Sequence, residues 1–266
     1  MSPESDAPSM QLGFEEAAAT FVSASQNARV WTEGWVARQL YCPNCGAERL
    51  GRQPNNNKVG DFACTTCAEE YELKSQKGRF GAKVNDGAFG AMCERLQASN
   101  NPSLLLMNYD LARLSVTDLI VVPKQFFVRK VIQQRPPLAP TARRAGWIGC
   151  NILLSEIPET GKLFIIRNGE PLPKREVLRQ WRRTLFLRDK ALEARGWLIE
   201  VMKCLELLGR HEFALDDVYT FEDRLSRIYP GNRHVRPKIR QQLQVLRDQG
   251  YLEFLSRGRY RTRAQA

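Results

Sequence analysis

The chain has 266 residues, 43% of them hydrophobic, which is enough apolar material for one large domain or two modest ones. Lysine and arginine total 40 against 29 aspartates and glutamates, and the resulting charge of +11 favours a polyanionic partner. No run of 18 apolar residues is present, which excludes a membrane-spanning helix, and two histidines, His211 and His234, are too few for a His-rich metal hydrolase.

The first elements precede a cysteine-rich segment. Residues 1–12 are expected to be disordered. The first ten residues, Met1 to Met10, lack the basic start and apolar stretch of a secretory signal, which favours a reducing cytoplasm. Two helices are predicted next, over Phe14 to Phe21 and Ala28 to Leu40. A turn at 53–57 then leads into a strand over Lys58 to Ala63.

Four cysteines follow the spacing C-x2-C-x18-C-x2-C: Cys42, Cys45, Cys64 and Cys67. Two tight turns with this spacing present four sulfurs to one tetrahedral zinc ion. A pair of disulfides is the alternative, which a reducing compartment disfavours. Because no histidine lies in the segment, the four thiolates leave no open position, so we expect a structural zinc site. The other three cysteines are expected to be buried, unreactive thiols: Cys93, Cys150 and Cys204.

A second strand is predicted over Glu70 to Ser75, where Glu72 and Lys74 alternate with apolar residues and share one face. Asp86 is expected to cap a helix that runs to Ala98. Apolar strands follow at 103–109 and 118–122. Strands alternating with helices in this way predict an α/β or α+β core.

The pattern D-x10-E-x-K places Asp61 at the end of one strand and Glu72 on its neighbour. Two carboxylates and the backbone carbonyl of Leu73 suit magnesium, and Lys74 would be free to face the attacking water. On its own the pattern is weak, because a solvated strand face often alternates Glu and Lys. The surrounding cysteine pairs strengthen it, since zinc would fix the register of both strands.

The C-terminal third predicts a winged helix. Helices are expected over Trp197 to Leu208 and Leu215 to Ile228, and a third follows the turn at 229–232. A hairpin then forms around Arg257 and Gly258. The third helix should bury Ile239, Leu243 and Leu246 and expose its polar face.

Glutamine pairs with adenine and arginine with guanine in the major groove, so Gln241 and Arg240 lead the base-reading candidates. Other residues of the same helix region join the DNA-binding set: His234, Arg236 and Gln244. Three arginines of the hairpin are expected on phosphates: Arg257, Arg259 and Arg261. The alternative is a winged domain that docks on protein through a solvated helix face.

Arg143, Arg144 and Trp147 lie in one loop after Pro140. Two cations and an indole suit a DNA contact, while a core tryptophan beside solvated arginines is an equally good interpretation of the residues alone.

Several stretches together resemble the DpnI-type restriction endonucleases: residues 28–45, 61–64, 72–75, 85–88 and 136–150. The run from Pro140 to Cys150 is especially specific, and the likeness extends to the C-terminus. The resemblance implies an α/β (α+β) PD-(D/E)xK nuclease core at 13–188 with an embedded four-cysteine zinc site, and a winged-helix domain at 189–266. The chain departs from the PD-(D/E)xK motif at one position, Gly60, where the motif has proline.

The resemblance also implies cleavage of double-stranded DNA at 5'-GATC-3' when its adenine is N6-methylated. Carried over by position, Asp61, Glu72 and Lys74 become the catalytic residues, and Trp147 packs on the adenine methyl groups. We expect catalytic Mg²⁺, structural Zn²⁺ and a monomer that nicks each strand in turn. Two other functions remain open: a zinc-ribbon and winged-helix DNA-binding regulator without nuclease activity, and a nuclease that reads a different modified sequence.

Overall fold

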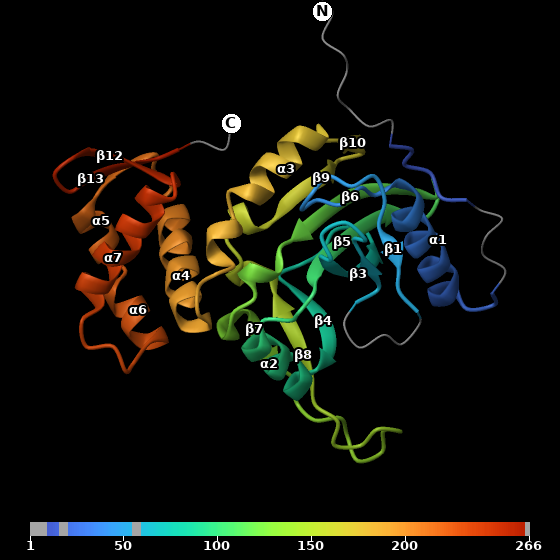
Figure 1. Ribbon diagram of the computed structural model, residues 1–266. Coiled ribbons are helices and arrows are strands. Elements are labelled where there is room, and N and C mark those ends of the chain that lie inside the picture. The colour runs from blue at the N-terminus through green and yellow to red at the C-terminus, as the bar shows by residue number, and fades with distance from the viewer. Residues whose placement is uncertain (1–9, 16–20, 55–59, 264–266) are drawn as a thin grey trace, which may run out of the picture.

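The fold is described from a computed structural model that covers residues 10–15, 21–54 and 60–263 (Figure 1). A mixed α/β core forms the larger part of the molecule, and the last third of the chain forms a smaller helical domain beside it. Among the helices within those ranges, none is both long enough and apolar enough to cross a membrane.

A seven-stranded sheet is the centre of the core. Its strands, in spatial order, are β1 (Gly51–Arg52), β2 (Phe62–Ala63), β3 (Glu70–Lys77), β5 (Ser103–Asp110), β6 (Ser115–Val122), β9 (Leu163–Arg167) and β10 (Glu170–Pro171). Strands β3 and β5 pair in parallel, and every other pair in this described sheet is antiparallel. The α/β core expected from the sequence is confirmed.

Strand β5 shows why the sheet lies inside the molecule. Leu104 and Leu106 pack into one hydrophobic cluster, whereas Leu105 and Met107 pack into the other. Successive side chains of a strand point to opposite faces, so a run of apolar residues without polar alternation requires cover on both sides.

Helices cover one face of the sheet and a second sheet covers the other (Figure 1). The first face carries α1 (Ala24–Gln39) and α3 (Lys174–Arg182), whose Trp35 and Trp181 are fully buried. The second face carries α2 (Phe89–Ala98) and a three-stranded antiparallel sheet. The strands of that sheet, in spatial order, are β4 (Lys83–Ala88), β8 (Gly149–Leu153) and β7 (Ile132–Gln134).

The C-terminal domain has the expected helix-turn-helix type of fold. Its helices are α4 (Leu192–Leu208), α5 (Leu215–Tyr219), α6 (Glu222–Ile228) and α7 (Val235–Asp248). Its sheet has the order β11 (Glu212–Ala214), β13 (Arg259–Thr262) and β12 (Leu252–Ser256). On α7 the inward positions Ile239, Leu243 and Leu246 are fully buried, as the helical spacing predicts.

Charged residues join the two domains in a buried network. The side chain of Glu200 on α4 is only 2% exposed, and its carboxylate lies 2.8 Å from the Nζ of Lys130 in the core. Arg224 on α6 completes the set, 3.8 Å from Glu200 and 3.9 Å from Glu156. One hydrophobic cluster also runs across both domains, so the helical domain is packed against the core.

Several predicted elements before residue 60 are either outside the described residues or differ from the structure. Residues 16–20 of the first predicted helix and Lys58–Val59 of the first strand lie outside the described residues, and so does most of the 53–57 turn. Phe14 is extended, because its N–H bonds to Leu114 and its ring stacks on Trp31, so a helix beginning there is wrong. Of the 1–12 segment, residues 1–9 are outside the description, while Leu12 accepts a hydrogen bond from Val116.

The predicted helix cap at Asp86 is wrong. Asp86 lies in strand β4 opposite Cys150, and the helix begins only at Phe89. Pairing with β8 and an ion pair made by its carboxylate determine the conformation of Asp86 more strongly than its capping preference. The predicted helix at 215–228 is instead two short helices, α5 and α6, with a break at Thr220 and Phe221.

Candidate active site and metal centre

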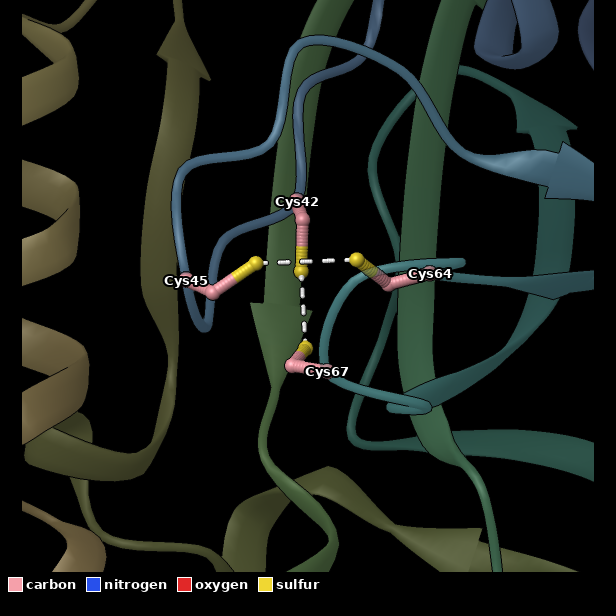
Figure 2. A group of neighbouring side chains, drawn as sticks. All are labelled: Cys42, Cys45, Cys64 and Cys67. Atoms are coloured by element: carbon pink, nitrogen blue, oxygen red, sulfur yellow. Dashed lines mark hydrogen bonds between the residues drawn. The ribbon is translucent and has the colours of Figure 1, made fainter.

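Four thiols meet in one cluster on the face of the central sheet that carries α1 and α3 (Figure 2). The Sγ atoms all lie within 4.8 Å of one another, with Cys42 3.6 Å from Cys67 and Cys45 3.5 Å from Cys64. A tetrahedral zinc ion with Zn–S bonds of about 2.3 Å separates its sulfurs by about 3.8 Å. The cluster therefore has a size and donor set that suit zinc, and all four cysteines are free of disulfides.

Two matching turns present these sulfurs. The carbonyl of Cys42 accepts the N–H of Gly46 at 2.8 Å, and the carbonyl of Cys64 accepts the N–H of Ala68 at 2.9 Å. Each turn brings its second cysteine, Cys45 or Cys67, back beside the first. The sequence spacing alone predicted this arrangement, since both turns are local.

Burial and hydrogen bonding act oppositely on the thiols. Burial raises the pKa of Cys42. At Cys64 burial also raises the pKa, but hydrogen bonds from the backbone of Cys67 and Thr66 outweigh it and lower the pKa to about 7. The Nδ2 of Asn44 donates to Cys67 Sγ at 3.3 Å, a polar contact that suits a negatively charged sulfur.

The backbone fixes Asp61 against strand β3. Its N–H donates to the carbonyl of Tyr71 at 2.9 Å, and its Oδ2 accepts the N–H of Leu73 at 2.8 Å. The Asp61 carboxylate is thereby held beside strand β3, close enough to Glu72 to act on it electrostatically. Gly60 allows this close approach, because a Cβ there would lie 2.9 Å from the Tyr71 carbonyl oxygen. Proline at position 60 would carry that Cβ, which accounts for the departure from the motif's name.

Glu72 and Lys74 lie on one face of β3, as their alternation predicts. The Nζ of Lys74 is 2.6 Å from Glu72 Oε1 and 2.8 Å from Asp86 Oδ1. The expectation that Lys74 is free to face water is wrong for this structure, because two carboxylates hold its ammonium group. Asp86 is the residue that sequence reasoning missed at this site.

The electrostatics follow from these contacts. Burial raises the pKa of Glu72, the nearby Asp86 and Asp61 carboxylates raise it further, and Lys74 offsets part of the rise. Burial lowers the pKa of Lys74, but Glu72 and Asp86 outweigh it and leave the pKa above its usual value. The raised pKa keeps the Lys74 side chain cationic at neutral pH.

The loop between β7 and β8 carries the predicted DNA contacts of the core and projects from the molecule (Figure 1). Arg143 and Arg144 are exposed, and the Arg144 guanidinium lies 4.8 Å from the centroid of the half-buried Trp147 ring. The indole rests on Gly149, where a Cβ would lie 2.7 Å from two ring atoms. Trp147 belongs to neither hydrophobic cluster, so the core-tryptophan alternative does not describe it.

On α7 the polar side chains are displayed as expected. Arg240, Gln241 and Gln244 are all exposed, opposite the buried positions of the same helix. Arg236 lies at the start of α7 and pairs with Glu222 at 2.7 Å, and His234 is the residue before the helix begins. These exposed positions form the side of α7 that the sequence predicts to face DNA.

The hairpin arginines differ from one another. Arg257 and Arg259 are exposed at the turn, and no ion pair involves them among the residues that the structure covers. Arg261 pairs with Glu212 at 2.7 Å and Glu253 at 3.5 Å on the surface of the small sheet. Its charge is partly neutralised before any ligand arrives, which distinguishes it from the other two.

Fold and site together define a two-domain protein of the DNA-binding helix-turn-helix class, with an α/β core that holds a four-cysteine cluster and a helix-turn-helix type domain at its C-terminus. A family model described as DpnI, the Dam-replacing family, matches residues 10–190, and one described as DpnI_C, the Dam-replacing HTH domain, matches residues 193–262. The chain belongs to this family of DpnI-type, methyl-directed restriction endonucleases. DNA is accordingly its partner.

Proposed function

We propose that the protein is a magnesium-dependent type II endonuclease that hydrolyses double-stranded DNA at 5'-GATC-3' containing N6-methyladenine. The observation that carries the proposal is the fixed position of Asp61, whose Oδ2 accepts the Leu73 N–H at 2.8 Å beside Glu72. Lys74 lies 2.6 Å from Glu72 on the same strand face. A DNA-binding regulator has no need of this arrangement.

The donor set at this point fits magnesium. The Asp61 carboxylate, the Glu72 carboxylate and the Leu73 carbonyl would hold the ion, and all three are hard oxygen ligands. When bound, magnesium lowers the pKa of a water ligand and neutralises negative charge that develops on the phosphate.

The protein's own groups would then act as follows. Asp61 and Glu72 are the catalytic carboxylates, and they provide the negative charge that attracts the metal. Lys74, which is cationic, stabilises the pentacovalent phosphate by hydrogen bonding and charge. The four thiolates would hold structural zinc, which leaves no ligand position open for catalysis.

Both domains would read the methyl groups. Burying one methyl group discriminates by about 1–3 kcal/mol, or roughly 10- to 200-fold, which is little protection for unmethylated DNA. Trp147 in the core and the α7 surface of the second domain offer two separate places for such contacts. Two independent factors multiply, so selectivity would reach a useful level only when both domains engage.

The remaining parts of the proposal concern the whole molecule. The protein would act as a monomer that cuts the two strands in turn, in a reducing cytoplasm that suits seven free cysteines. Residues 13–188 would form the catalytic domain and residues 189–266 the DNA-binding domain.

A plasmid test decides the main claims. Plasmid from a methylating host should be cut at GATC in magnesium, and the same plasmid from a non-methylating host should survive. Asp61→Ala should bind the methylated plasmid without cutting it. Equal cleavage of both plasmids would reject methyl reading, cleavage elsewhere would reassign the sequence, and binding without scission by the wild type would favour the regulator.

A further inference from the structure

Lys74 has a second anionic partner that lies outside the D-x10-E-x-K pattern. Asp86 Oδ1 lies 2.8 Å from Lys74 Nζ, and the Asp86 side chain is only 5% exposed. Glu72 holds the same ammonium group at 2.6 Å. The Lys74 ammonium group therefore forms ion pairs with two carboxylates that come from different strands.

The two strands belong to different sheets. Glu72 and Lys74 lie on β3 of the central sheet, whereas Asp86 lies on β4 of the three-stranded sheet. The β4–β8 ladder shifts register between Asp86 and Ala88, and such a bulge re-aims the side chains beside it. The contact from Asp86 to Lys74 is thus a polar connection that spans the two sheets at the candidate active site.

The same bulge also supports the projecting loop. Asp86 lies opposite Cys150, and Ala88 lies opposite Gly149, the residue on which the Trp147 indole rests. The Sγ of Cys150 donates to the carbonyl of Gly87 at 3.4 Å inside the bulge. The pair Asp86–Cys150, which holds the partner of Lys74, is therefore next to the pair Ala88–Gly149, on which the Trp147 loop packs.

Metal binding would make the two carboxylates unequal. If Glu72 binds a divalent cation, it gives up part of its negative charge to that ion and attracts Lys74 less strongly. Asp86 is buried on β4 of the other sheet and is not one of the proposed metal ligands, so its contact with the lysine would remain. Without Asp86, the Lys74 ammonium group would have no carboxylate partner to hold it once Glu72 binds the metal.

We infer that Asp86 is a positioning residue, which holds the Lys74 ammonium group toward the scissile phosphate while Glu72 binds the metal. The inference rests on the proposed nuclease function and extends it to a residue outside the motif. Partners of this kind typically contribute 10- to 100-fold to activity.

A double-mutant cycle tests whether Asp86 acts through Lys74. The variants are Asp86→Asn, Lys74→Met and the two combined, with Asp118→Asn as the control. Asp118 is also a buried strand aspartate, 7% exposed, but its Oδ1 accepts the N–H of Asn168. Single-turnover cleavage of the methylated duplex is measured in saturating magnesium, and duplex affinity is measured separately in calcium.

Asp86→Asn should cut roughly 10- to 100-fold more slowly at unchanged duplex affinity, and it should add no further loss to Lys74→Met. Asp118→Asn should cut as fast as the wild type. An equal loss from Asp86→Asn in both backgrounds, or no loss in either, would overturn the inference and leave the proposed function standing. Should Asp86→Asn not fold, Asp86→Ser supplies the same comparison.

Failure of the proposed function has a different signature. If the wild type cuts another sequence or ignores methylation, the cycle is run on the DNA that is cut, and its outcome still decides the role of Asp86. A wild type that binds duplex but cuts none would reject the nuclease and this role for Asp86 together.

Discussion

The hydroxyl of Tyr71 lies 3.1 Å from the Sγ of Cys42, and the carbonyl of the same tyrosine accepts the Asp61 N–H at 2.9 Å. Tyr71 is fully buried and directly precedes Glu72. One residue therefore contacts the thiolate cluster through its side chain and the candidate metal ligands through its backbone. This connection predicts that the candidate magnesium site depends on the structural integrity of the cysteine cluster.

Loss of zinc should accordingly abolish cleavage, even though zinc takes no part in the chemistry. Chelation, or Cys45→Ser, should lower the melting temperature and release β2 and β3, because a structural zinc site contributes directly to folding. Cys93→Ser is the control, since Cys93 lies outside the cluster. Circular dichroism measures the melting temperature, and the zinc content of each variant shows whether the ion has been lost. Full stability of Cys45→Ser without zinc would contradict the dependence, and removing magnesium alone should leave the melting temperature unchanged.

The environment of Glu72 favours its protonated form, which predicts a gain in stability from Glu72→Gln. The folded-state pKa of Glu72 is raised, so its favourable contribution is present below the ordinary carboxyl pKa and is lost as pH rises through the raised value. The glutamine variant lacks this loss. In magnesium-free buffer without a chelator, which leaves the zinc site intact, it should therefore melt higher than the wild type at pH 7, with a smaller difference at pH 4, although cleavage is abolished.

Glu170→Gln serves as the control for this comparison, because Glu170 is exposed on the edge strand β10. It should melt as the wild type does at both pH values. A Glu72→Gln variant that melts lower than the wild type at pH 7 would show that its pairing with Lys74 outweighs burial and the two neighbouring carboxylates.

The exposed face of α7 should carry base recognition. Arg240→Ala and Gln241→Ala should each weaken binding to the methylated site by about 1–3 kcal/mol, since each would lose a bidentate contact in the major groove. Arg247→Ala, near the end of the same helix and paired with Asp248, should bind normally. Affinities are measured by fluorescence anisotropy in the Asp61→Ala background, which binds without cutting. Equal losses on random duplex would assign these residues to phosphates instead.

The arginines of the hairpin should differ in their salt dependence. Arg257→Gln and Arg259→Gln should each reduce the slope of log affinity against log salt by about 1, because each would remove one phosphate contact. Arg261→Gln should change the slope less, since Glu212 and Glu253 already hold that guanidinium. Binding titrations across a range of salt concentrations measure the slopes, and identical slopes for all three variants would show that the ion pairs open on DNA.

Local patterns in the sequence predicted the parts of the site that depend on local geometry. The cysteine spacing determines two tight turns, and alternation on β3 places Glu72 and Lys74 on one face. Asp86 was missed because its contact with Lys74 joins two sheets. An aspartate just before an apolar, helix-forming run also matches a helix cap, and only the pairing of β4 with β8 resolves this ambiguity.

Discrimination between methylated and unmethylated DNA should depend on the packing of the Trp147 indole against Gly149 as well as on the indole itself. Trp147→Ala removes the apolar surface, and Gly149→Ala places a Cβ 2.7 Å from the ring atoms, so the ring must move. Both variants should lose about 10- to 200-fold of the preference for methylated over unmethylated duplex, which is the value of one methyl contact. The preference is measured as the ratio of single-turnover cleavage rates on the two duplexes.

The control for this loop is Ala145→Ser, which alters an exposed position and should keep the full preference. Gly146→Ala is a poor control because Gly146 has a positive φ. If Gly149→Ala discriminates as well as the wild type while Trp147→Ala does not, the indole reads the methyl group only after leaving Gly149, and the loop must rearrange when DNA binds.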